Sequence, residues 1–169
     1  MELDDSTLSA AEIEALARRI DRPVVLVGMM GVGKTSIGRK LAALLHVPFV
    51  DADEEIEQAA QMTISEIFAQ FGEEYFRDGE RRVIARLIDG PGTRRVIATG
   101  GGAFVNPETR ALILDKAIAV WLDSDVEVLV ERVGRKDTRP LLRQGDPREI
   151  LTRLKAEREP AYEIGRAHV

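Results

Sequence analysis

Short apolar runs alternate with amphipathic segments along most of the chain. The apolar runs have the composition of strands that are buried on both faces of a parallel sheet. They occupy residues 24–27, 48–50, 96–98 and 117–122. Segments with apolar residues at helical spacing separate them, at 35–45, 54–60, 63–72, 74–88, 126–133 and 146–158, with one more beginning at Asn106 and Pro107. Strands alternating with helices predict an α/β fold of three layers, with a parallel sheet covered by helices on both faces.

The same pattern divides the chain into parts. Residues 1–21 contain a capping box, Ser9 with Glu12, ahead of an amphipathic helix, and we expect an N-terminal helical extension there. Residues 22–162 form the predicted domain. Within that domain, residues 134–146 are polar, rich in arginine and without periodicity. This segment predicts a surface loop that acts as a lid over a ligand.

Composition narrows the range of partners and compartments. The 169 residues fit one domain, and the net charge of −5 gives no electrostatic reason to expect nucleic acid or a membrane surface as partner. The sequence has no cysteine, which excludes disulfides, thiolate metal ligands and a cysteine nucleophile. The longest uncharged apolar stretch, residues 23–32, is shorter than the ~20 residues that span a bilayer. We therefore expect a cytoplasmic monomer that acts on a small molecule.

Residues 28–35, with the sequence GMMGVGKT, match the phosphate-binding pattern G-x-x-x-x-G-K-[ST]. The pattern follows a predicted buried strand and precedes an amphipathic helix, a context that disfavours the alternative of a plain glycine-rich turn. Lys34 would place its charge on the β- and γ-phosphates of a nucleotide, and the Thr35 hydroxyl would coordinate Mg²⁺. The expected ATP-binding residues of this loop are Gly31, Val32, Gly33, Lys34, Thr35 and Ser36.

Further candidate residues follow the second and third predicted strands. Asp51 and Asp53 end the second strand, and residues 100–102, all glycine, follow the third. Ligands of open α/β sheets bind beyond the carboxyl ends of the strands, so these residues should lie beside the phosphate-binding loop. The two aspartates could instead cap the following helix, since aspartate is a favoured N-cap residue.

Six motifs together resemble the shikimate kinase family over residues 23–162. They are GMMGVGKTS at 28–36, FVDAD at 49–53, FRDGE at 76–80, GGGA at 100–103, RPLL at 139–142 and REPAY at 158–162. The resemblance implies a P-loop kinase fold similar to nucleoside monophosphate kinases. It also implies transfer of the γ-phosphoryl group of ATP to the 3-hydroxyl of shikimate, with Mg²⁺, in the pathway to chorismate and the aromatic amino acids.

The resemblance assigns expected roles around the nucleotide. Asp51 would orient the Mg²⁺ shell together with Thr35. Arg132 would bind ATP. Arg139, in the predicted lid, would close over the phosphates and join Lys34 in catalysis, although an arginine-rich loop is also typical of a plain surface charge cluster.

The resemblance also assigns an acceptor site. Asp53 would bind the hydroxyls of shikimate and act as the catalytic base. Arg77 and Arg158 would bind its carboxylate, and Glu80 would hold arginine and substrate in register. On a charged helix, Arg77 taken alone fits a solvated face equally well. The backbone of three glycines would approach the substrate ring: Gly100, Gly101 and Gly102.

Residues 163–169, EIGRAHV, depart from the family's pattern. Shikimate kinases continue here with a strand and a final helix, whereas these residues match the translation of a common sequencing-library adapter. We expect a non-native tail outside the fold and a sheet of four strands that lacks the last strand and helix.

Two alternatives stay open from the sequence. One is another small-metabolite P-loop kinase, such as a gluconate kinase or a nucleoside monophosphate kinase, which would also carry a basic lid. The other is a nucleotide-dependent sensor or interaction domain that reuses this fold without catalysis. Retention of Lys34, Asp53 and Arg139 favours a kinase over a sensor.

Overall fold

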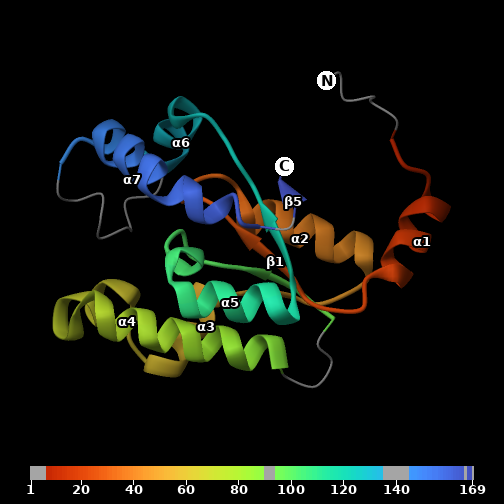
Figure 1. Cartoon of the computed structure of the whole chain (residues 1–169), viewed down its shortest axis with the longest axis horizontal. Coiled ribbons are helices and arrows are strands. Elements are labelled where there is room, and N and C mark those ends of the chain that lie inside the picture. The colour runs from red at the N-terminus through yellow and green to blue at the C-terminus, as the bar shows by residue number, and fades with distance from the viewer. Residues whose placement is uncertain (1–6, 90–93, 135–144, 166, 169) are drawn as a thin grey trace.

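The computed structural model of the chain describes residues 7–89, 94–134, 145–165 and 167–168 (Figure 1). The strands are β1 (Val24–Val27), β2 (Phe49–Asp51), β3 (Val96–Ala98), β4 (Ile118–Trp121) and β5 (Ala167–His168). The helices are α1 (Ala10–Arg19), α2 (Lys34–Leu45), α3 (Ala52–Ala60), α4 (Ile64–Asp89), α5 (Pro107–Lys116), α6 (Val126–Val133) and α7 (Pro147–Tyr162), with a 3₁₀ turn, η1, at Ala103–Val105.

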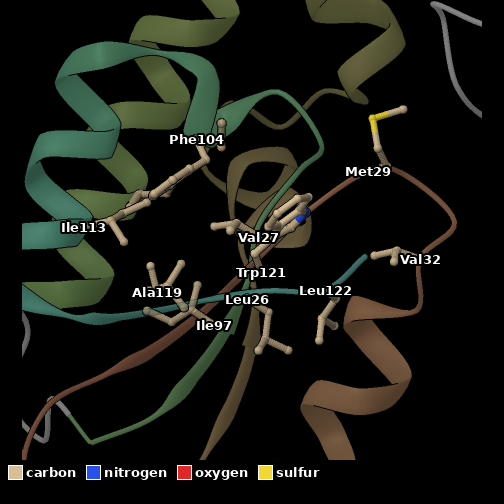
Figure 2. Packing of buried hydrophobic residues seen from close by; sticks show 14 of the residues in the cluster. Leu26, Val27, Met29, Val32, Ile97, Phe104, Ile113, Ala119, Trp121 and Leu122 are labelled. Atoms are coloured by element: carbon tan, nitrogen blue, oxygen red, sulfur yellow. The ribbon is translucent and has the colours of Figure 1, made fainter. Parts of the chain in front are cut away.

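The strands form one parallel sheet in the order β2-β3-β1-β4-β5. The central strand β1 is buried along its whole length, because it has a neighbouring strand on each side and helices over both faces. Leu26 of β1 faces α2, where a Cβ added to Gly38 would lie 3.2 Å from it. Ile113 of α5 packs on the other side of the strands (Figure 2). The predicted three-layer α/β fold is therefore confirmed.

Strand β5 corrects the expectation of a four-stranded sheet. Ala167 and His168 pair in parallel with Val120 and Trp121 of β4. The backbone groups along the free edge of β4 need hydrogen-bond partners, and the segment after α7 supplies them. The expectation that residues 163–169 lie outside the fold is wrong for this pair, whereas their non-native origin stays a prediction.

Helix α4 contains the break that the sequence places at Gly72. This residue has φ 83° and ψ 176°, a non-helical backbone conformation that glycine adopts readily, and it joins two helical segments. Thr63 and Glu66 form a capping box at the start of the first segment. The break separates the first segment from the one that carries Arg77 and Glu80.

Helix α7 is longer than expected and positions part of the site. It continues through Pro160 to Tyr162, past the predicted end at Arg158. Arg158 and Tyr162 are four residues apart, so both project from one face of the helix, and both are buried.

The N-terminal helix α1 packs against α2 (Figure 1). Arg94 donates a hydrogen bond from Nη2 to the carbonyl of Ala17, at 2.7 Å, which attaches the helix to the start of β3. Across the described ranges, the helices are all too short or too polar to cross a bilayer.

Candidate functional site

The carboxyl ends of β1, β2 and β3 place the predicted site residues in two adjoining cavities. The phosphate loop, residues 28–35, follows β1, and Asp51 and Asp53 follow or end β2. The glycine loop, residues 100–102, follows β3. One cavity, of about 220 Å³, lies over the phosphate loop, and the other, of about 80 Å³, lies beside the glycine loop. Asp53 lines both cavities and so marks the place where two bound molecules would meet.

The phosphate loop has the conformation of an anion cradle. Gly28, Gly31 and Gly33 have φ of 140°, 81° and 102°, values that other residues rarely adopt. Gly33 is the N-cap of α2, whose first backbone N–H groups therefore point into the cavity at the positive end of the helix dipole. The Lys34 ammonium donates to the carbonyls of Gly28 and Met29, at 2.5 and 2.9 Å, and Lys34 also lines this cavity.

The cavity over the phosphate loop, the phosphate cavity below, brings together most of the predicted nucleotide-binding residues. It is lined by Gly31, Gly33, Lys34, Thr35, Ser36, Asp51, Asp53, Thr99, Arg132 and Val133. Val32 is the exception among the predicted loop residues, because its side chain is buried in the core. Its carbonyl instead accepts a hydrogen bond from Arg132 Nη1, at 2.9 Å. Sequence reasoning missed Thr99 and Val133, which no motif includes.

Thr35 and Asp51 provide oxygen atoms at the floor of the phosphate cavity. Thr35 Oγ1 donates to Asp51 Oδ2 at 3.2 Å. Asp51 Oδ1 caps α3 by accepting from the backbone N–H of Asp53 at 2.9 Å. The capping role considered from the sequence is thus real for Asp51, but it uses only one of the two carboxylate oxygens.

The Thr35–Asp51 pair suits Mg²⁺. This ion retains several waters and takes one or two protein oxygens beside nucleotide phosphates. The described part of the chain has no cluster of three or more acidic or histidine side chains that would form an all-protein cage. The donor set therefore fits a nucleotide-bound ion.

The second cavity, the acceptor cavity below, gathers the residues predicted for the substrate. Its charged lining consists of Asp53, Arg77, Glu80 and Arg158, from three helices. The glycine loop forms one wall. The apolar remainder, which sequence reasoning missed, is Met30, Ile64, Phe68 and Phe76. Met30 stands at a variable position of the phosphate-loop pattern and nonetheless contributes to this lining.

The glycine loop lies against these charged groups, and a side chain at any of its three positions would collide with one. The nearest atoms to an added Cβ are Asp53 Oδ1 at 2.9 Å for Gly100, Arg158 Nη1 at 3.0 Å for Gly101, and Arg77 Nη2 at 2.2 Å for Gly102. The three glycines therefore permit close approach of the loop backbone to these side chains, whereas its approach to a substrate ring stays a prediction.

Glu80 and Arg158 are buried charges with unused hydrogen-bonding atoms. Glu80 is 1% exposed, and its Oε1 accepts from Arg77 Nη1 at 2.8 Å. Burial raises the pKa of Glu80, an effect that the adjacent Arg77 opposes and Asp53 reinforces. Glu80 Oε2 and Arg158 Nη1 have no hydrogen-bond partner among the described residues. A polar ligand in this cavity could pair with both atoms.

Of the two arginines predicted to bind ATP, Arg132 and Arg139, the structure describes only Arg132. Arg132, on α6, lines the phosphate cavity and donates from Nη1 to the carbonyls of Gly31 and Val32. Arg139 and the motif at 139–142 lie outside the described residues.

Comparison with known proteins gives matches over nearly the whole chain. A family model described as shikimate kinase matches residues 30–169. A shikimate kinase of Novosphingobium aromaticivorans is 70% identical over 171 residues, covering 100% of this chain and 89% of that protein. One of Caulobacter vibrioides is 62% identical over 148 residues, covering 88% and 73%. The solved structure of a shikimate kinase from Acinetobacter baumannii in complex with shikimate has a TM-score of 0.84 at 36% identity, over 95% of this chain and 87% of that one.

Proposed function

This chain belongs to the shikimate kinase family, and we propose that it transfers the γ-phosphoryl group of ATP to the 3-hydroxyl of shikimate, giving shikimate 3-phosphate and ADP. The family match supports this reaction, which belongs to the pathway to chorismate and the aromatic amino acids. One observation carries the proposal: Asp53 lines both the phosphate cavity and the acceptor cavity, so a donor and an acceptor bound in the two would meet at its carboxylate.

The phosphate loop is the proposed site of ATP. Backbone N–H groups of Gly31, Gly33 and the start of α2 would hold the phosphates, and Lys34 would neutralise the charge on the transferring group. Ser36 would complete this cradle from the first turn of the helix. Lys34 already points its ammonium at the mouth of the loop through its hydrogen bonds to loop carbonyls.

Thr35 and Asp51 are the proposed protein ligands of Mg²⁺, Asp51 through water. The ion would supply positive charge at the phosphates while they transfer. The two residues are joined by a hydrogen bond, and α3 holds Asp51 in place by donating backbone N–H groups to its other oxygen. This arrangement fixes the Asp51 carboxylate before a nucleotide binds.

The acceptor cavity is the proposed site of shikimate. Arg77 and Arg158 would bind its carboxylate, since guanidinium groups match a carboxylate in shape and charge. Glu80 would anchor Arg77 through the existing 2.8 Å bond. The acceptor hydroxyls would face Asp53, and the glycine loop would close on the ring.

Asp53 is the proposed base for the attacking hydroxyl. Phosphoryl transfer leaves little covalent work for the protein, so orienting this hydroxyl beside the phosphate cavity is its main contribution. Arg139 would close over the phosphates from the lid, in agreement with its motif, and Arg132 would hold the nucleotide from α6. The monomeric state and the cytoplasmic location remain predictions.

A substrate panel with coupled detection of ADP release tests the proposal. We expect ADP release that depends on shikimate and on Mg²⁺, with little or none for gluconate or nucleoside monophosphates. Strong turnover of gluconate or of a nucleotide, with none of shikimate, would overturn the assignment.

Replacing Asp53 by Asn separates a kinase from a sensor domain. Asp53→Asn keeps the shape of the side chain and removes its basicity, so we expect turnover to fall by about 100-fold or more while ATP binding changes little. Isothermal titration with ATP measures the binding, and Glu54→Gln, one residue on and outside both cavities, is the matched control. Parallel loss of ATP binding and turnover would contradict the catalytic role.

A further inference from the structure

Tyr162 contacts both loops of the site without belonging to either cavity lining. It ends α7 and is only 1% exposed. Its ring stacks on Trp121 of β4, with centroids 6.0 Å apart. Its hydroxyl donates to the carbonyl of Gly101 in the glycine loop and lies 3.9 Å from the sulfur of Met29 in the phosphate loop.

The Gly101 backbone has little freedom to move. A Cβ at this position would lie 3.0 Å from Arg158 Nη1 and 3.3 Å from the backbone nitrogen of Met30. Gly101 is therefore packed between an acceptor-site arginine and the phosphate loop. A shift of the Gly101 backbone would therefore change the space available to Arg158 on one side and to the phosphate loop on the other.

Tyr162 and Arg158 project from the same face of α7, one helical turn apart, so a displacement of this turn would shift both. Burial raises the pKa of the Tyr162 phenol, an effect that the positive charge of Arg158 only partly opposes. The phenol therefore keeps its proton at neutral pH and remains a donor to Gly101. The hydroxyl ties the helix that carries Arg158 to the loop that Arg158 contacts.

We propose that Tyr162 is a positioning residue for the acceptor: its hydroxyl holds the Gly101 carbonyl so that the glycine loop and Arg158 are already placed for the acceptor carboxylate. The inference rests on the proposed function, because it takes the acceptor to be a small acid bound by Arg158. Without the hydroxyl, the part-buried carbonyl loses its partner and turns to find another, and part of the acceptor's binding energy restores the loop.

A purely structural role is the competing explanation. Tyr162 also fills the core against Trp121, and a buried hydroxyl must pair with some acceptor wherever it lies. In that case, removing the hydroxyl would lower stability and leave substrate affinity unchanged. The two explanations therefore differ in the KM for the acceptor.

Tyr162→Phe tests the proposal, because it removes the donor and keeps the stacked ring. We expect the KM for shikimate to rise about 5- to 30-fold, the effect of losing one hydrogen bond to a part-buried carbonyl. The KM for ATP and kcat should stay within about twofold, since the lost interaction acts on acceptor binding in ground and transition states alike. Gly101→Ala acts at the other end of this path, because its Cβ would lie 3.0 Å from Arg158 Nη1, and it should also raise the KM for shikimate if Tyr162→Phe proves too unstable to assay.

Two control variants separate positioning from stability. Tyr75→Phe makes the same chemical change at a residue that is 57% exposed and stacked on Phe71. Ile113→Val removes one methyl group from a fully buried position in α5 and should raise the equilibrium constant for unfolding about 2- to 12-fold. Both should keep the wild-type KM for shikimate.

The outcomes distinguish this inference from the function on which it rests. If wild-type protein releases no ADP in response to shikimate, the proposed function fails and the inference fails with it. If the wild type is active but Tyr162→Phe and Gly101→Ala keep its KM for shikimate, the function stands and the positioning role is wrong. An equal rise in the KM values for ATP and shikimate would also contradict the positioning role.

Discussion

Replacing Gly102 by Ala should weaken acceptor binding while leaving the fold intact. Gly102 has φ −97° and ψ −5°, a conformation open to alanine, so the backbone is not strained. The new Cβ would instead lie 2.2 Å from Arg77 Nη2, and ordinary contact begins at 3.4 Å. The guanidinium is the far end of a flexible side chain, so it moves away and leaves Glu80, which it now contacts at 2.8 Å.

The expected magnitude follows from the charged hydrogen bond that Arg77 can no longer make to the acceptor. Such bonds contribute about 1.5–3 kcal/mol, so the KM for shikimate should rise about 10- to 150-fold. The KM for ATP should change little, because Arg77 does not line the phosphate cavity. Steady-state kinetics with coupled ADP detection measures both constants, and thermal melting checks the fold.

A control and a double variant sharpen this test. Gly79→Ala lies on the same helix, two residues after Arg77, and its Cβ would meet no atom within 4 Å. It should leave both KM values unchanged and raise stability by about 0.5–1 kcal/mol. If Gly102→Ala acts through Arg77, adding it to Arg77→Met should cost little more. A folded Gly102→Ala variant with wild-type KM for shikimate would refute the reasoning.

Two further predictions concern stability. Because burial raises the pKa of Glu80 above its ordinary value of 4.5, the folded state holds this proton more tightly than the unfolded state, and stability should fall as pH rises from about 4.5 through the folded pKa. Urea unfolding between pH 4.5 and 7.5 measures this dependence: Glu80→Gln should not show the fall in stability, whereas the exposed control Glu73→Gln should show it as the wild type does. Parallel curves of stability against pH for wild type and Glu80→Gln would contradict the prediction. Gly38→Ala would place a Cβ 2.5 Å from Phe49 Cε2, so urea unfolding should show that the free energy of unfolding falls by about 1–3 kcal/mol, with no change in either KM. Wild-type stability of this variant would contradict the tight α2–β2 contact.

Local sequence pattern and sheet geometry made part of the site predictable from the residues themselves. The phosphate loop needs only its glycines, Lys34 and the flanking strand and helix. Asp53 and the glycine loop follow buried strands, and the carboxyl ends of parallel strands meet at one edge. Their approach to one another therefore follows from the order of elements along the chain.

Arg77 and Arg158 could be placed only through the family resemblance. An arginine on a charged helix has the same local pattern whether it is solvated or buried, and only the tertiary structure shows that Arg158 is 7% exposed. The apolar lining at Met30 and Phe68 was missed for the opposite reason, since apolar residues at helical or loop positions usually indicate core packing.

The short strand β5 was not predictable because its own residues carry little strand pattern. Ala167 and His168 pair with β4 because an unpaired edge lies within reach of the end of α7. Gly72 was predictable for the converse reason: a glycine between two amphipathic segments marks a break whatever surrounds it.

The most direct test of the central claim is a crystal structure of the protein with ADP, Mg²⁺ and shikimate. We expect the carboxylate of shikimate to contact Arg77 and Arg158, with its 3-hydroxyl between Asp53 and the phosphate cavity. Shikimate bound elsewhere, for example in the cavity of about 270 Å³ between α3 and α4, or turned so that its carboxylate faces Asp53, would contradict the account.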